Sequence, residues 1–162
     1  MAVAEIIGSA IGAMILIVVA YLLVGNVLTT AEVVSNAQKD LSQLAESRIQ
    51  TNIEITNVTV SGPAVNLTVK NTGNQAIGDF LHTDVLLYSV GDPTGYHVYI
   101  YNKTDTATPG SWTKSILNDY VHPGELDPGE SMFVNVYFTG STPNHYDVGV
   151  CTNNGVYASV TA

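Results

Sequence analysis

An uncharged stretch of 26 residues lies between Glu5 and Glu32 and dominates the N-terminal part of this sequence. Residues 6–28 supply 23 predominantly apolar positions, whereas a membrane-spanning helix needs about 20. A secretory signal peptide begins with basic residues and has an apolar core of only about 7–15 residues. The first basic residue here is Lys39. The sequence therefore predicts a helix that enters a membrane, and the rest of the chain offers no all-α core in which a soluble protein would bury it.

The helical pattern continues beyond the apolar segment to about Arg48, without any proline. Apolar or small residues recur at alternating spacings of three and four, which is typical of a coiled-coil seam. This seam consists of Val27, Thr30, Val34, Ala37, Leu41 and Leu44. Gly8 and Gly12 have the G-x-x-x-G spacing that lets apolar helices approach closely. We expect these residues to mediate self-association; the alternative is a stalk that folds back on its own domain.

From Thr51 the pattern changes to the two-residue alternation of β-strands. Eight strands are predicted, at 52–60, 64–71, 80–88, 96–101, 112–117, 131–138, 145–151 and 155–160. Turn residues separate them, including Asp92-Pro93 and Asn153-Asn154-Gly155, and the latter predicts a type I′ hairpin. The predicted fold class is α+β: a helix over 1–50, then an antiparallel immunoglobulin-like sandwich of seven or eight strands over 51–162.

Composition and motifs argue against several functions. The net charge is -9 with only five Lys or Arg residues, which disfavours nucleic acid as a partner. No nucleophile, phosphate-loop or zinc-protease motif occurs, so we expect no enzyme activity and no cofactor. The single cysteine, Cys151, forms no intrachain disulfide and is interpreted as a small core residue.

Metal binding is also not expected. The four histidines are predicted at surfaces or strand edges, without metal-ligand spacing. They are His82, His97, His122 and His145. The acidic segment that holds Asp119, Glu125, Asp127 and Glu130 offers oxygen ligands for Ca²⁺, but lacks the order of an EF-hand. It is interpreted as a solvated loop rather than a calcium site.

Three N-x-[ST] sequons begin at Asn57, Asn66 and Asn102. They matter only if the domain lies outside the cell, where N-glycans are attached to such sites. Asn102 lies in the irregular region 91–122 and is the favoured candidate. Asn57 and Asn66 lie within predicted strands, so they are candidates only if their side chains face outward.

The combination of Glu5, a permanently apolar N-terminal helix and a β-sandwich resembles type IV pilin-like subunits, and in particular archaellins. The segments "NAQKDLSQLAESRIQTNIEITNV", "NLTVKNTG", "LDPGESMFVNVYF" and "HYDVGVCTNNGVYASVTA" are similar to archaellum stator-type proteins. The first resemblance implies a homopolymeric extracellular filament with bundled helices. The second implies an envelope protein that is anchored in the membrane by its helix and binds the surface layer.

The expected surroundings of Glu5 differ between the filament subunit and the membrane-anchored protein. In a pilin-like filament the resemblance implies that Glu5 pairs with the α-amino group of a neighbouring subunit, which compensates a buried charge. An anchored protein would leave Glu5 among lipid headgroups. Met1 as a translation start would favour the anchor, and Met1 exposed by leader cleavage would favour the filament. We expect the filament subunit, with the stator-type anchor as the alternative.

Overall fold

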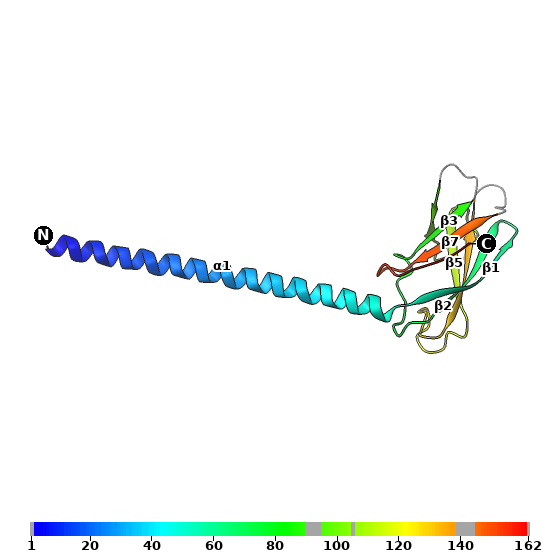
Figure 1. The fold of residues 1–162 in the computed structure, drawn as a ribbon, viewed down its shortest axis with the longest axis horizontal. Coiled ribbons are helices and arrows are strands. Elements are labelled where there is room, and N and C mark those ends of the chain that lie inside the picture. Colours follow the sequence, from blue (N-terminus) through cyan, green and yellow to red (C-terminus); the bar gives the residue numbers. More distant parts are fainter. Residues whose placement is uncertain (1, 90–94, 105, 139–144, 162) are drawn as a thin grey trace. The chain divides into compact units, whose positions relative to one another are not determined.

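The computed structural model describes residues 2–89, 95–104, 106–138 and 145–161 (Figure 1). Met1 and the predicted Asp92-Pro93 turn lie outside the described residues. The chain forms two compact units, Met1–Leu44 and Ala45–Ala162, which are considered separately below. We refer to the second unit as the head.

Helix α1 runs over Ala2–Gln50, which confirms the predicted long helix (Figure 1). Its sequence has no proline, and its polar side chains do not disturb it, because the hydroxyls bond back to carbonyls of the preceding turn. Ser9 bonds to Ile6, Thr29 to Gly25, and Ser42 to Gln38, at 2.9–3.0 Å. Arg48 lies in the last turn, where a cation interacts favourably with the helix dipole.

Eight strands follow among the described residues, as predicted. They are β1 (Ile53–Ser61), β2 (Ala64–Asn71), β3 (Asp84–Ser89), β4 (His97–Tyr101), β5 (Ser111–Ile116), β6 (Ser131–Tyr137), β7 (Tyr146–Cys151) and β8 (Tyr157–Thr161). They pair in the order β1-β2-β6-β5-β4-β3-β7-β8. The terminal strands β1 and β8 lie against one another, so the sheet wraps into a nearly closed sandwich.

One pairing differs from the predicted antiparallel arrangement. Strands β4 and β5 run parallel, with Ile100 opposite Ser111 and Tyr101 opposite Trp112. The connection brings the chain back beside the end of β4, and β5 then continues in the same direction as β4. The side chain of Asn102 organises it: its amide donates to the carbonyl of Thr106 at 3.1 Å and to the hydroxyl of Thr108 at 3.3 Å. This parallel pair joins two groups of antiparallel strands.

The core lies between the inward faces of these strands. In β2, the alternate residues Val65, Leu67 and Val69 are fully buried, as the two-residue pattern predicts. Together with Leu67, Trp112 and Leu126 are the largest fully buried side chains of the same core. Apolar burial of this kind contributes about 25 cal/mol per Å² and is the main stabilising term of the head.

Three local predictions are wrong. The strand predicted at 80–88 begins only at Asp84, because residues 80–83 form a turn in which Thr83 bonds back to Asp79 at 2.9 Å. Cys151 is half-buried on the opposite face of β7 from Val148 and Val150, and is not a core residue.

The third correction concerns the β7–β8 hairpin. The hairpin itself is confirmed, but its turn is not type I′, since that type needs positive φ at both central residues and Asn154 has none. Instead Gly155, at φ 80°, follows a turn closed by its N–H bond to Thr152 O at 2.9 Å.

Candidate assembly surface and the head that carries it

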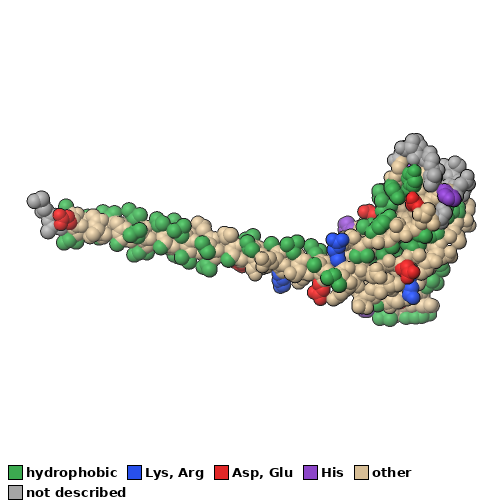
Figure 2. Space-filling view, in the orientation of Figure 1, with side chains coloured by type: hydrophobic (Ala, Val, Ile, Leu, Met, Phe, Trp, Pro, Cys, Tyr) green, Lys and Arg blue, Asp and Glu red, His purple; other side chains and the backbone are tan. Residues whose placement is uncertain are grey.

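The N-terminal half of α1 exposes apolar side chains on every side. Six successive residues illustrate this, with exposed fractions of 46–71%: Met14, Ile15, Leu16, Ile17, Val18 and Val19. Because each residue advances the helix by about 100°, six in a row cover its whole circumference. Figure 2 shows the hydrophobic side chains along this part of α1. Among the described residues, α1 is the helix long and apolar enough to cross a membrane.

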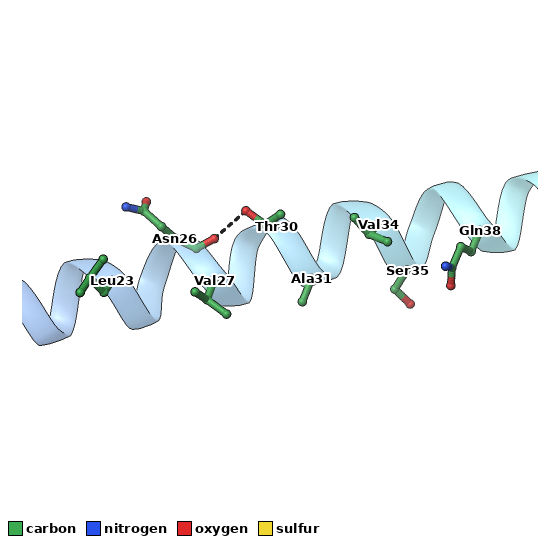
Figure 3. Close-up of a pocket in the computed structure, with 8 residues that line it drawn as sticks. All are labelled: Leu23, Asn26, Val27, Thr30, Ala31, Val34, Ser35 and Gln38. Carbon is green, nitrogen blue, oxygen red and sulfur yellow. Dashed lines mark hydrogen bonds between the residues drawn. The ribbon is translucent and has the colours of Figure 1, made fainter.

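A shallow apolar groove, open to solvent along α1 and lined by side chains of this helix alone, follows this segment (Figure 3). It is lined by Leu23, Asn26, Val27, Thr30, Ala31, Val34, Ser35 and Gln38. Three residues of the predicted seam, Val27, Thr30 and Val34, therefore line one continuous surface. The hydroxyl of Thr30 donates to Asn26 O at 2.8 Å, so it needs no partner from another molecule.

The remaining predicted assembly residues lie on α1 outside this groove. Leu41 and Leu44 are 66% and 58% exposed, and Ala37 is exposed as well. Gly8 and Gly12 have no atom within 4 Å of the position that a Cβ would take, which leaves this patch of helix backbone open. Glu5 is exposed in the first turn, where a carboxylate is favoured by the helix dipole.

The last turn of α1 belongs to the head and is fixed there by a buried polar cluster. The Asn154 amide donates to Thr51 Oγ1 at 2.7 Å and lies 3.3 Å from Ser47 O. Thr51 Oγ1 in turn donates to Ser47 O at 2.8 Å. The Thr152 hydroxyl completes the cluster by donating to Asn154 Oδ1 at 2.6 Å. Sequence reasoning read Asn154 only as a turn residue and missed this role.

A second loop closes around the same helix end. The backbone N–H groups of Thr72 and Gly73 donate to Asn52 O at 2.9 and 3.0 Å, and that of Asn74 donates to Gln50 O at 2.8 Å. A Cβ at Gly73 would lie 2.5 Å from Gln50 O and Asn52 N. Only glycine allows the loop to approach so closely, which explains the Asn71-Thr72-Gly73 turn signal.

The acidic segment is mostly exposed, as expected of a solvated loop, but its carboxylates are engaged within it. Asp127 is buried, and its carboxylate lies 2.9 Å from Nδ1 of His122. Glu130 accepts from the Asp127 N–H at 3.0 Å, and Asp119 accepts from the Gly124 N–H at 2.7 Å. Each of these carboxylates thus caps a turn. No group of potential metal ligands occurs among the residues that the structure describes.

The His122–Asp127 pair affects protonation. The hydrogen bond that the His122 imidazole donates to the Asp127 carboxylate, assisted by the charge of Asp127, raises the pKa of His122 above 6.5. All four histidines are exposed, as predicted, and they come from separate parts of the head. A similar pair joins His82 to Asp79 at 2.8 Å, and this hydrogen bond lowers the pKa of the Asp79 carboxyl.

The three sequons differ in their surroundings. Asn57 is exposed on β1, beside a register shift, and Asn66 is half-buried on β2. Asn102 is half-buried, and its amide nitrogen is engaged in the β4–β5 connection described above. Of the three, Asn57 has the amide most open to modification.

A family model and a related sequence match this chain. The model of the archaeal-type flagellin family matches residues 4–162. An uncharacterized protein of Archaeoglobus fulgidus is 27% identical over 121 residues, which cover 72% of this chain and 68% of the relative.

Solved structures of archaellum proteins share the fold. The archaellum periplasmic stator protein FlaG of Sulfolobus acidocaldarius has a TM-score of 0.54 at 19% identity, over 69% of this chain and 99% of that one. The archaeal flagellin FlaB1 of Methanocaldococcus jannaschii has a TM-score of 0.53 at 14% identity, over 68% and 88% of the two chains. Because the family model covers almost the whole sequence, the chain belongs to the archaeal-type flagellin family, whose members are structural components of the archaellum.

Proposed function

We propose that this chain is a filament subunit of an archaellum, polymerised through α1 with the heads on the outer surface. The observation that carries this proposal is the exposure of α1: apolar side chains surround its N-terminal half, and an apolar groove continues through Val27 and Val34. An aqueous environment does not tolerate so much exposed apolar surface. A membrane can cover it before assembly, and the helices of neighbouring copies can cover it afterwards.

Glu5 and the two N-terminal glycines fit this arrangement. A carboxylate buried among apolar helices needs a counter-charge, which a cationic group of a neighbouring copy would supply. The open backbone at Gly8 and Gly12 would allow a neighbouring helix to approach closely. In this proposal α1 spans the cytoplasmic membrane first, and the assembled filament is extracellular.

The alternative is an envelope-anchored stator-type protein whose head binds the surface layer. One observation favours it: the likeness to the FlaG stator protein covers 99% of that solved chain. The likeness to the flagellin FlaB1 is of the same quality, with a TM-score of 0.53 against 0.54, so the head fold supports both. The seam on α1 favours the filament, because a single anchor helix does not need one.

The experiment compares two adjacent valines of α1. Val34 lines the groove, whereas Val33 is 62% exposed but lies outside it. Val34→Asn places an amide in the proposed helix contact and should abolish filaments seen by electron microscopy. Val33→Asn makes the same chemical change outside the groove and should retain them. Membrane-fraction protein is measured in both strains to confirm insertion.

Three outcomes decide between the proposals. Loss of filaments in Val34→Asn alone supports polymerisation through the groove. Filaments of normal length in both variants would contradict it. If the unmodified chain stays in the membrane without forming filaments and co-purifies with surface-layer protein, the stator-type function is correct instead. Deletion of residues 1–30 should give a soluble chain that forms no filaments.

A further inference from the structure

Strands β4, β3, β7 and β8 present an outward face that carries several tyrosines. On β3, Tyr88 lies directly across from Asp147 of β7. The ring of Tyr96, next to the start of β4, lies 5.3 Å from the ring of Tyr88, centroid to centroid, at an interplanar angle of 40°. Two tyrosines and one carboxylate are therefore neighbours on the same side of the sheet.

A third tyrosine reaches this cluster because Gly149 has no side chain. Tyr157 of β8 pairs with Cys151, and its ring crosses diagonally over Gly149, which is two residues from Asp147. A Cβ at Gly149 would overlap the Tyr157 ring and hydroxyl. We call the group of Tyr88, Tyr96, Tyr157 and Asp147 the tyrosine cradle.

One carboxylate oxygen of Asp147 lacks a partner in this cradle. Its Oδ1 is buried and has no hydrogen-bond partner among the described residues. Desolvation, followed by the charge of Asp147, raises the pKa of the Tyr96 hydroxyl. A buried carboxylate oxygen without a hydrogen-bond partner is costly unless a cation compensates it. Aromatic faces beside a carboxylate are suited to an ammonium group.

The same face continues as an exposed apolar surface along β4. Val98 and Ile100 are 59% and 75% exposed, and Val98 pairs with the half-buried Leu86 of β3. Lys103 is exposed just beyond the end of β4. A cation, Lys103, therefore lies beyond one end of β4, exposed apolar side chains lie along the strand, and the tyrosine cradle lies at its other end.

We propose that the tyrosine cradle of one copy binds the Lys103 ammonium group of a neighbouring copy, while Val98 and Ile100 are covered in the same contact. This inference rests on the proposed function, because it requires copies that assemble. The two charged ends of the surface are complementary to each other. A contact that joins unlike ends of identical subunits is heterologous, and it generates an open helical filament when the rotation between subunits does not close a ring.

Lys103 cannot reach the cradle of its own chain. Tyr96 and Lys103 are separated by seven positions, or about 23 Å of extended strand at about 3.3 Å per residue. The other two lysines of the head have neighbours within their own chain. Lys70 lies opposite Glu54 in the β1–β2 pair. Lys114 Nζ donates to Gly124 O at 2.7 Å and lies 3.9 Å above the centre of the Phe80 ring.

A charge swap tests the proposed contact in filaments of the full chain. Asp147→Lys and Lys103→Glu each place like charges in the contact, and each should raise the protein concentration needed for polymerisation about tenfold or more. The double variant restores opposite charges and should return most of the lost polymerisation. Glu125→Lys, the same change at another exposed acidic residue of the head, should have little effect.

Carbodiimide cross-linking gives a second readout that does not depend on filaments. Full-length protein in detergent, mixed from ¹⁴N- and ¹⁵N-labelled copies, should give an amide between Asp147 of one copy and Lys103 of another. The adjacent Glu54 and Lys70 serve as the internal positive control within one copy.

The outcomes separate this contact from the proposed function. If the unmodified chain forms no filaments, that function fails, and the cross-link alone then decides whether the head contact exists. If filaments form but single and double charge variants polymerise like the unmodified chain, the head contact is wrong while the helix-based function stands. A cross-link from Asp147 to a different lysine, or none beside a positive control, would also overturn it.

Discussion

The side-chain amide of Asn154 donates to the hydroxyl of Thr51 at 2.7 Å, although the two residues are 103 positions apart in the sequence. Thr51 follows the last residue of α1, and Asn154 lies in the β7–β8 turn. Through this bond the C-terminal hairpin holds the residue at which the helix ends. The head therefore fixes the last turn of α1 from two sides, by this hairpin and by the loop at Gly73.

Asn154→Ala is expected to destabilise the head. It removes the donor for Thr51 and the acceptor for Thr152, both of which are buried. Loss of such partners typically costs about 1–3 kcal/mol. The measurement is the midpoint of thermal unfolding, followed by tyrosine and tryptophan fluorescence. Asn74→Ala, at an exposed position, is the control and should unfold like the original chain.

Gly73→Ala should also destabilise the head, by a steric mechanism. The new Cβ would meet two backbone atoms at 2.5 Å, and neither can move without shifting the helix end or β1. Overpacking of this kind typically costs about 1–3 kcal/mol. Denaturant unfolding measures the loss. Gly25→Ala, in a helix segment with no atom within 4 Å of the added carbon, should leave head stability unchanged.

The His122–Asp127 pair predicts a pH dependence with a definite sign. The pKa of His122 is raised in the folded state, so its contribution is fully present below about pH 6.5 and is lost as the pH rises through the folded pKa. His122→Gln should therefore lower the unfolding midpoint most at acidic pH. The difference from the original chain should shrink towards alkaline pH. A difference that is constant from pH 5 to 9 would contradict the ion pair.

Glu5→Ala tests the charge at the start of α1. If Glu5 is buried against a cation of a neighbouring copy, removal of one partner costs about 3–5 kcal/mol per contact. Repeated at every subunit, this should abolish or greatly slow polymerisation while membrane insertion persists. Filament yield per cell is compared for Glu5→Ala and Glu5→Gln, with membrane-fraction protein as the control. Unchanged yields in both variants would leave the groove as the only basis for assembly.

Asn57 is expected to carry an N-glycan more often than Asn102. Asn57 is exposed, whereas the Asn102 amide holds the β4–β5 connection and would have to leave it to be modified. Mass spectrometry of tryptic peptides from the native archaeal host measures occupancy at each site. Asn102→Gln should lower head stability even without a glycan, while Asn57→Gln should not. A fully occupied Asn102 would overturn this ranking.

The helix and most strands could be predicted because their patterns are local. Residues 6–31 contain neither charge nor proline, and Val65, Leu67 and Val69 alternate as a half-buried strand requires. Both signals depend only on neighbouring residues.

The errors arise where distant segments decide the structure. The parallel pairing of β4 with β5 depends on how the Asn102 connection folds back. The burial of Asp127 depends on His122 and on the N–H groups of its loop. Asn154 reads as a turn residue until the end of α1 is placed beside it. The proposed assembly residues of α1 could be nominated from spacing alone, and their role stays a prediction.

The contact between β1 and β8 affects how copies of the head behave when they are packed closely together. In the strand order of the head these two strands are the only ends of the sheet among the described residues, and they lie against one another. A free strand edge offers unpaired N–H and C=O groups to any neighbouring chain and invites uncontrolled aggregation. A polymer holds its subunits at very high local concentration. Because β1 and β8 shield one another without being paired, the head exposes little free strand edge to a densely packed neighbour.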